Sequence, residues 1–488
     1  MTINLLILYT VHNYKDYRNK KGLLKMKQTR FVLINASPKG EYSLSLQYAK
    51  YLFVHEENVE HTLVHVGERL TMMDYDESWL AETIEAIEKS DAIIWATPVY
   101  TMLVPWQLVR FFDLIKQKGR LSVFSGKYAT AVMSCFHYYD HLAEEWLRGT
   151  CEDAGMSFIE GLSVDNKDLL DADFRKSMRF FMKEFHMACV NQIPVPRKSM
   201  PIVQGTIPIF EPTIITTDDN PKKDIKTVLL TDEYQKDGNL SKMIDVFLAS
   251  YPNHVEVIDI NTYQYEGACQ GCLRCELVGE CDRNDGFQTF YQDLVNSCDV
   301  LVHAMNIEGR YLKPVWKLFL DRTFANGHRT SMMGKHSCYL VSGPLGQVPQ
   351  VRQFLEGKDR VGRENSMGII SDEVADSARL QAMIADMARR VDRASRAKYQ
   401  KGVNFLGVGG MKIFRDLIYG MRGVVRDDHR FYKARKLYDF PQKDIKNQLF
   451  NVFMAVAFLF KPVRIGAYEN MKPLYIAAHK RIVDSKKL

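Results

Sequence analysis

Four cysteines lie close together in the pattern Cys269-x2-Cys272-x2-Cys275-x5-Cys281. A [4Fe–4S] cube needs four thiolates, and a Cys-x2-Cys-x2-Cys run wraps one corner of the cube while a fourth cysteine closes it. Structural zinc more often uses two Cys-x2-Cys pairs separated by a long loop. Gly271 supplies permissive backbone inside the run. Three interpretations stay open at this point: an iron–sulfur cluster, a zinc ion, or four unligated thiols.

A second candidate site follows the apolar segment Phe31–Asn35, which is typical of a buried strand. The polar loop after it leads into a segment with helical periodicity, so its groups lie at a helix N-terminus, where free N–H groups attract phosphate. The glycine spacing of a dinucleotide fingerprint is missing, which favours a mononucleotide such as FMN. The candidate phosphate ligands are Ser37, Lys39, Ser43 and Ser45. An ordinary helix cap is the alternative.

Two further loops follow later strands and are candidates for the flavin ring. In an open parallel sheet, ligands bind outside the carboxyl ends of the strands. The first loop follows the strand expected at 91–96, and the second, rich in aromatic residues, follows the strand expected at 128–133. The candidate ring-binding residues are Pro98, Val99, Tyr100 and Thr101 from the first loop and His137 from the second. A surface aromatic cluster is the alternative for the second loop.

The elements that position these loops divide the chain into two similar halves. Six of the sixteen prolines lie between residues 192 and 224, which predicts an extended linker. On each side of it, short unalternating apolar runs alternate with helical segments, as in parallel strands covered on both faces. From Asp91 to Asp113 is 22 residues, and from Asp299 to Asp321 is also 22. The sequence therefore predicts an α/β protein with two tandem, doubly wound parallel sheets.

The expected domain boundaries follow from these patterns. They are an N-terminal extension (1–25), a first α/β domain (26–191), the proline-rich linker (192–224), a second α/β domain with the cysteine loop (225–398) and a basic helical C-terminal extension (399–488). Helices are expected at 411–421 and at 449–460. The second of these is too short to span a bilayer, and we expect it to be buried.

Composition narrows the class of protein. The 488 residues, 46% hydrophobic and 25% charged, are typical of a soluble globular protein. Nine cysteines, four of them in one loop, do not resemble a secreted disulfide framework and fit a reducing cytoplasm. From 400 to 488 there are 18 Lys and Arg against 7 Asp and Glu. The expected partners of this basic tail are an acidic redox protein or an anionic membrane surface, with a solvated helical face as the alternative. Nucleic acid is not an expected partner, and a homo-oligomer remains open.

These motifs resemble a known family. Ser37-Pro38-Lys39, Thr97-Pro98-Val99-Tyr100 and the helix at 106–113 are similar to those of the flavodoxin-like NAD(P)H-dependent FMN reductases. The second half resembles their iron–sulfur flavoprotein branch through Cys269-Gln270-Gly271-Cys272-Leu273-Arg274-Cys275, Gly279-Glu280-Cys281 and Lys317-Leu318-Phe319-Leu320-Asp321-Arg322. The resemblance covers roughly residues 29–396. It implies two flavodoxin-like domains, FMN, a nicotinamide nucleotide as electron donor, and a [4Fe–4S] cluster on Cys269, Cys272, Cys275 and Cys281.

The second half departs from the family where a phosphate would bind. Asp232 and Glu233 stand where the family carries small polar and basic residues, and carboxylates beside a helix N-terminus repel phosphate. We therefore expect one flavin half and one cluster half. The function expected is an FMN-dependent NAD(P)H oxidoreductase that passes electrons through flavin to an acceptor, by way of the cluster. The alternative is a non-catalytic redox-sensing or docking module whose cysteines bind zinc or stay as thiols.

Overall fold

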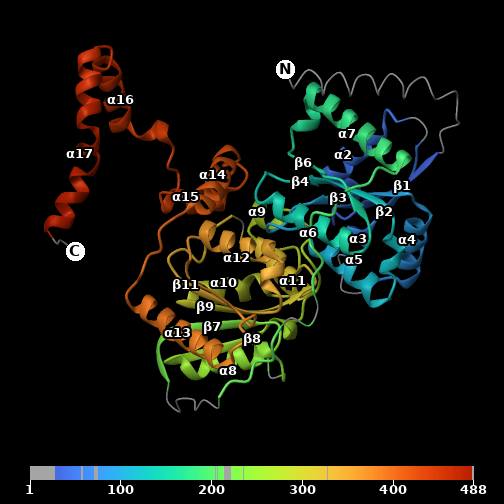
Figure 1. The fold of residues 1–488 in the computed structure, drawn as a ribbon, viewed down its shortest axis with the longest axis horizontal. Helices are drawn as coiled ribbons and strands as arrows, with labels where there is room; N and C mark the ends of the chain where they lie inside the picture. The colour runs from blue at the N-terminus through green and yellow to red at the C-terminus, as the bar shows by residue number, and fades with distance from the viewer. Residues whose placement is uncertain are drawn as a thin grey trace, which may run out of the picture. The chain divides into compact units, whose positions relative to one another are not determined.

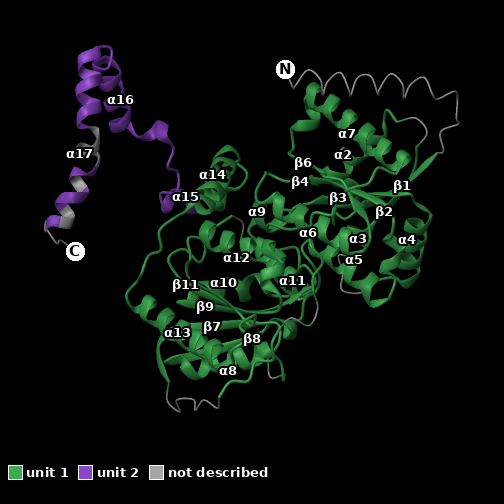
Figure 2. Cartoon of the chain, viewed as in Figure 1, with its two compact units in different colours: residues 1–429 green, residues 430–488 purple. Residues whose placement is uncertain are grey.

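The computed structural model describes the chain apart from residues 1–27, 57–58, 71–74, 204, 206, 214–220, 235, 327 and 486–488. The predicted N-terminal extension (1–25) therefore lies outside the described residues. The described chain divides into two compact units, Met1–His429 and Arg430–Leu488 (Figure 2). Both α/β halves lie in the first unit.

The first half is a parallel sheet with helices on both faces (Figure 1). Its strand order is β2-β1-β3-β4-β5, with β6 beside β4. The strands are β1 (Thr29–Asn35), β2 (Val59–His65), β3 (Ala92–Pro98), β4 (Tyr128–Ser134), β5 (Ser157–Phe158) and β6 (Leu162–Val164). The helices are α2 (Leu44–Phe53), α3 (Val66–Arg69), α4 (Glu77–Lys89), α5 (Trp106–Gln117), α6 (Asp140–Asp153) and α7 (Ala172–Asn191).

The second half repeats this architecture. Its strand order is β8-β7-β9-β11-β12, with a short antiparallel β10 beside β9. The strands are β7 (Lys222–Thr231), β8 (Asn253–Asp259), β9 (Val300–Glu308), β10 (Tyr311–Leu312), β11 (His336–Ser342) and β12 (Asn365–Ser371). The helices are α8 (Asn239–Ser250), α9 (Arg274–Val278), α10 (Phe287–Ser297), α11 (Pro314–Arg322), α12 (Pro349–Gly362) and α13 (Ser377–Arg396). The predicted fold class, two tandem doubly wound parallel sheets, is confirmed.

Buried apolar strands explain why both halves fold in this way. In β1 the side chains of Phe31, Leu33 and Ile34 are buried, and in β9 those of Val300 and Val302 are buried. Strands covered on both faces read as continuous apolar runs, because neither face meets water. In Figure 1, α2 and α7 cover one face of the first sheet, while α8 and α13 cover the corresponding face of the second.

Equivalent helices join the two halves. Helix α5 packs against α11, and α6 packs against α12. Each of these pairs consists of helices that follow corresponding strands, so the two halves meet as the two subunits of a symmetric dimer would. Arg310, almost fully buried, makes a two-pronged ion pair with Asp153, with Nε–Oδ2 and Nη2–Oδ1 distances of 2.6 and 2.8 Å. Gly149 on α6 leaves room for it, since a Cβ there would lie 2.5 Å from Cδ of Arg310.

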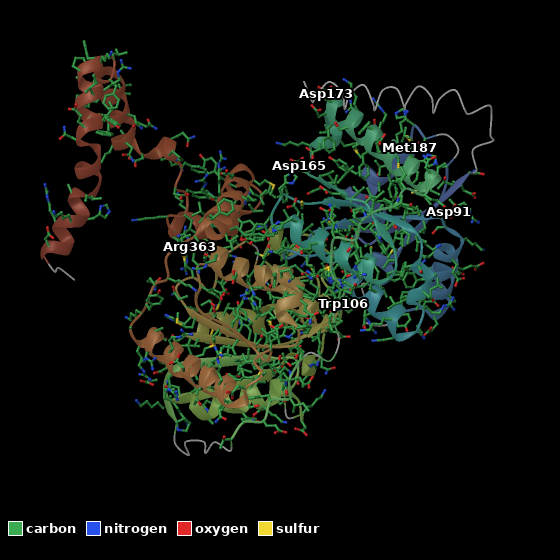
Figure 3. The ribbon with its side chains drawn as sticks, in the orientation of Figure 1. Asp91, Trp106, Asp165, Asp173, Met187 and Arg363 are labelled. Carbon is green, nitrogen blue, oxygen red and sulfur yellow. The ribbon has the colours of Figure 1, made fainter. Side chains whose placement is uncertain are left out.

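A buried ion pair lies at the centre of this interface. Lys317 and Asp321, one turn apart on α11, bind each other with side chains 0% and 1% exposed. The second oxygen of Asp321 accepts the backbone N–H of Trp106 at 2.8 Å and so caps the start of α5. Lys317 also donates to the carbonyl oxygen of Tyr100 at 2.7 Å. Trp106, labelled in Figure 3, lies where the halves meet, in a small apolar cluster with Ala268 and Leu318.

The C-terminal region is helical, as predicted, but one of its helices is not buried. Helices α14 (Phe405–Gly420) and α15 (Arg426–Ala434) follow the second sheet, and α16 (Ile445–Ala457) and α17 (Lys461–Ser485) follow them. Helix α14 packs on α12. The prediction that 449–460 is buried is wrong for the described chain, because α16 has no buried residue. Its apolar composition calls for a cover, and its own unit supplies none among the described residues. No helix in the described part of the chain is long and apolar enough to cross a membrane.

Replacing Asp321 with alanine is expected to destabilise the first unit strongly. The variant leaves the Lys317 ammonium group buried without its partner, and breaking a buried pair in this way costs about 3–5 kcal/mol. Thermal and urea unfolding of the variant measure the loss. The matched control is Glu85→Ala, which breaks the exposed Lys89–Glu85 pair at the same i, i+4 spacing and should leave the melting temperature nearly unchanged. Equal stability of Asp321→Ala and the parent would contradict the role given to this pair.

Candidate functional site

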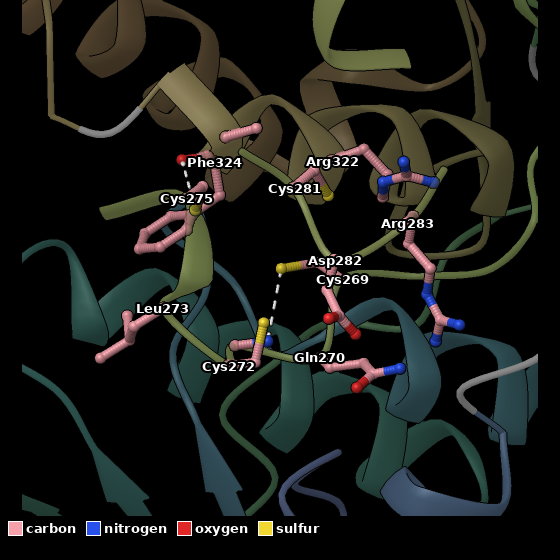
Figure 4. Close-up of a pocket in the computed structure, with 12 residues that line it drawn as sticks. Cys269, Gln270, Cys272, Leu273, Cys275, Cys281, Asp282, Arg283, Arg322 and Phe324 are labelled. Carbon is pink, nitrogen blue, oxygen red and sulfur yellow. Dashed lines mark hydrogen bonds between the residues drawn. The ribbon is translucent and has the colours of Figure 1, made fainter. Parts of the chain in front are cut away.

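The cysteine loop forms a hollow between β8 and α10. All four cysteines of the predicted ligand set line one pocket, together with Arg322 and Phe324 from the end of α11 and the turn after it. Figure 4 shows their side chains arranged around this hollow. Gly271 and Gly279 have φ of +62° and +82°, left-handed conformations that side chains rarely adopt, so the loop needs glycine at both places.

The donor set of the pocket suits a four-iron cluster. Four thiols line one pocket, and a [4Fe–4S] cube needs four thiolates, each on a different corner. Zinc also accepts four cysteine ligands, with bonds of about 2.3 Å. The ligand of this loop stays a prediction.

The electrostatic surroundings determine the state of the thiols. Burial raises the pKa of Cys269 to about 12, and the charge of Asp321 acts in the same direction. Burial also raises the pKa of Cys275 to about 12. Without a ligand both are protonated thiols at neutral pH, so a metal centre must displace their protons. Arg322, held by a two-pronged ion pair to Asp285 with both distances 2.6 Å, brings a fixed positive charge to the wall.

The first half meets this loop through Tyr100 and Lys39. A Cβ on Gly271 would lie 1.9 Å from the hydroxyl oxygen of Tyr100 and 3.1 Å from Cε of Lys39. Gln107 of α5 donates to the carbonyl oxygen of Cys269 at 3.0 Å. The Tyr100 hydroxyl is buried and has no hydrogen-bond partner among the described atoms. A buried hydroxyl normally finds a partner, so it fits a bound group at the junction of the two loops.

Lys39 lies between the predicted phosphate loop and the cysteines. The residue as a whole is exposed, but partial burial of its ammonium group lowers the pKa of that group, while negative charge at Cys269 and Cys272 acts in the opposite direction. A cation in this position is available to a phosphate on one side and to thiolates on the other. Its predicted role as a phosphate ligand stays a prediction.

The three serines of the phosphate loop are buried and locally bonded. Ser43 caps α2 by accepting the N–H of Leu46 at 3.3 Å, and its hydroxyl is 2.9 Å from that of Ser45. The Ser37 hydroxyl accepts the N–H of Lys39 at 3.3 Å. These bonds are those of a helix cap, which was the alternative interpretation of the loop. A phosphate role for the serines also remains a prediction.

The predicted ring loop is held by both halves. The N–H of Val99 donates to Ser134 at 3.1 Å, which ties Pro98 and Val99 to the end of β4. Thr101 has φ of +47° and its hydroxyl donates to Leu320 at 3.4 Å across the interface. A threonine in the left-handed region is strained, and such strain persists only where the surroundings impose it.

His137 lies in a separate cluster at the end of β4. Its Nδ1 is 3.2 Å from Asp140, whose carboxylate also binds Ser163 and lies 3.6 Å from the sulfur of Cys135. Burial alone raises the pKa of Asp140, but the hydrogen bonds from Ser163 and His137 bring it below its usual value. The ring of the neighbouring Tyr138 lies 4.3 Å from that of Phe414 on α14. The predicted ring-binding role of His137 stays a prediction.

In the second half, the loop that corresponds to the phosphate loop contains two carboxylates. Thr227 pairs with Val300 as Phe31 pairs with Ala92, so Asp232 and Glu233 stand at the positions of Ala36 and Ser37.

Both carboxylates in this second loop have partners. Asp232, 1% exposed, accepts the N–H of Asn306 at 3.0 Å and the indole N–H of Trp316 at 3.0 Å. Glu233 forms an ion pair with Lys313. Burial raises the pKa of Asp232 to about 6. Both carboxylates thus lie in the loop where a phosphate would bind, and negative charge beside a helix N-terminus disfavours FMN in the second half.

Sequence analysis missed several of the contacts around the cysteine hollow. Lys317 and Asp321 were noted only as part of a family motif, and the contacts of Gln107 and Phe324 with the cysteine loop were not expected. One signal was present. Two opposite charges at i and i+4 in the apolar helix at 314–322 lie on the same helix face, where they can bind each other and be buried as a pair.

The strand order and the ligand loops at the carboxyl ends of β1 and β3 define a flavodoxin-like α/β protein. Residues 29–162 match the sequence model of the NADPH-dependent FMN reductases. An iron–sulfur flavoprotein from Archaeoglobus fulgidus is 25% identical over 221 residues, which cover 43% of this chain and 99% of that protein. The predicted resemblance to FMN reductases and iron–sulfur flavoproteins is confirmed.

Solved structures similar to the chain include two flavoenzymes. The apo form of the NADH:FMN oxidoreductase EMOB is 20% identical, with a TM-score of 0.29, and the match covers 33% of this chain and 89% of that one. The NAD(P)H:acceptor oxidoreductase FerB from Paracoccus denitrificans is 18% identical, with a TM-score of 0.30, covering 34% and 98%.

Gly271→Ala is expected to be more damaging than Gly279→Ala. Both positions have positive φ, which costs an L-residue about 1–2 kcal/mol. Only at Gly271 does the new methyl group collide with Tyr100, which adds about 1–3 kcal/mol of overpacking, whereas at Gly279 the nearest atom is 3.7 Å away. Urea unfolding of both variants measures the difference. Equal losses would mean that Tyr100 does not press against the loop.

Proposed function

We propose that the chain is an FMN-dependent NAD(P)H oxidoreductase whose first half binds FMN and whose cysteine loop binds a [4Fe–4S] cluster. When bound, FMN accepts a hydride from a nicotinamide nucleotide and releases electrons one at a time, and such a cluster accepts them singly. The observation that carries the proposal is the contact between the two loops. Tyr100 of the predicted ring loop touches Gly271 of the cysteine loop.

Each residue group has a distinct proposed task. Lys39 and the serines of the phosphate loop hold the FMN phosphate, and Pro98 to Thr101 position the ring. Cys269, Cys272, Cys275 and Cys281 bind the cluster. The buried hydroxyl of Tyr100 donates a hydrogen bond to the group bound between the ring loop and the cysteine loop. Arg322 offsets the negative charge that four thiolates bring.

Electrons are proposed to leave the protein from the cluster half, where the acceptor binds. An acidic redox protein or an acceptor at an anionic membrane surface both fit a chain with a basic tail, and a reducing cytoplasm is the proposed compartment because all nine cysteines are free. The competing function is a redox-sensing or docking module. A colourless protein that contains zinc and no flavin would support that function and refute the oxidoreductase.

The intact chain is expected to bind one FMN, and Lys39→Ala to weaken that binding about ten-fold or more. Losing one charged hydrogen bond costs about 1.5–3 kcal/mol, and 1.4 kcal/mol is about ten-fold. Fluorescence titration of the apoprotein measures both the stoichiometry and the affinity. Lys236→Ala, in the corresponding loop of the second half, is the matched control and should not change FMN affinity. Two FMN per chain, or full affinity in Lys39→Ala, would refute the assignment.

Cys272→Ala is expected to remove the iron and the broad visible absorption of the cluster while the flavin bands remain. A cube that loses one of its four thiolates has one iron without its protein ligand, so the protein holds the cluster less tightly. Iron, zinc and flavin are quantified in anaerobically purified protein, together with the absorption spectrum. Cys189→Ala, on α7 in the other half, is the control and should retain parental iron. Parental iron in Cys272→Ala, or zinc in place of iron in the parent, would contradict the cluster.

A further inference from the structure

Helix α16 and the residues just after it carry large apolar side chains that remain exposed in the described structure. Each is between 57% and 75% exposed. We call this set the apolar surface: Ile445, Leu449, Phe450, Val452, Phe453, Val456, Leu459 and Phe460. Aliphatic and aromatic side chains of this size are normally covered, and a continuous exposed set marks a contact site.

The apolar surface is arranged as one broad face of the helix. Ile445, Leu449, Val452 and Val456 recur at i, i+4, i+7 and i+11. Asn447, Gln448 and Asn451 lie together on the opposite side and carry no charge. A helix with this pattern lies along an apolar boundary with its polar side in water.

Most charges around the apolar surface are positive, and the nearest carboxylate, Asp444, caps the start of α16 by accepting the N–H of Asn447. Lys446 lies within it, Lys461 and Arg464 follow it, and no Asp or Glu occurs between residues 445 and 468. Residues 430–488 contain 13 Lys and Arg against 4 Asp and Glu. A second copy of the chain would bring like charges together at the contact, whereas an anionic surface would neutralise them.

We infer that the apolar surface docks on an anionic lipid bilayer, with α16 lying in the plane of the membrane–water boundary. The phenylalanines and aliphatic side chains enter the boundary between headgroups and acyl chains, and Lys446, Lys461 and Arg464 meet the lipid phosphates. The helix does not span the bilayer. Its 13 residues are about 20 Å long, shorter than a hydrocarbon core of about 30 Å.

Flotation of the intact chain with lipid vesicles tests this inference. Vesicles of phosphatidylcholine with phosphatidylglycerol should bind the chain at least ten-fold more tightly than vesicles of phosphatidylcholine alone, and added salt should weaken the binding. Phe450→Ser with Phe453→Ser should reduce the affinity at least ten-fold. Phe180→Ser is the matched control, because Phe180 lies on a helix of the first unit and is 66% exposed, as Phe453 is.

Three results would overturn the inference. The first is equal binding to neutral and anionic vesicles, and the second is parental binding by the double variant. The third is absence of binding to either kind of vesicle. A concentration-dependent dimer that the double variant loses would then identify a second copy of the chain as the occupant. Capture of an acidic ferredoxin would identify a redox protein as the occupant. Circular dichroism and the FMN content of each variant establish that it is folded, and neither measurement depends on the membrane contact.

Discussion

The ion pair between Lys317 and Asp321 holds the candidate site together. Its two side chains are fully buried, and each forms a second bond to the other half of the protein. Asp321 caps the helix that begins at Trp106, and Lys317 fixes the carbonyl of Tyr100. Because charges without partners are very costly inside a protein, the pair allows few alternative arrangements of these groups. The position of the Tyr100 hydroxyl beside Gly271 therefore depends on a buried charge pair on α11 that binds the ring loop directly and lies outside both the phosphate loop and the cysteine loop.

Much of the fold was predictable because it depends on local patterns. Short unalternating apolar runs between helical segments specify buried parallel strands, and the equal spacing of Asp91–Asp113 and Asp299–Asp321 revealed the repeat. The cysteine loop was recognisable from its spacing alone. Local sequence patterns do not show which residues far apart in the chain contact each other. Tyr100 and Lys317 are separated by 217 positions, and no periodicity within either segment records their contact.

The wrong expectation about residues 449–460 has a physical reason. Apolar composition showed that residues 449–460 need a cover, but it did not say which surface supplies one, and the described structure leaves α16 exposed. Likewise, the aromatic residues after β4 did not indicate that Tyr138 packs on Phe414, more than 270 residues away in sequence. Because the hydrophobic effect is non-directional, an apolar sequence shows that burial is favourable but does not show which surface the side chains contact.

The duplicated architecture explains how the two halves came to differ. Equivalent helices face each other across the interface, as in a two-fold dimer, and identical subunits would have to carry both sites in every copy. Because both halves belong to one chain, their sequences differ and each half can carry a different site. One half can keep an open phosphate loop while the other fills its own with Asp232 and Glu233. Asp232 then stabilises the second half by accepting hydrogen bonds from Asn306 on β9 and from Trp316 on α11.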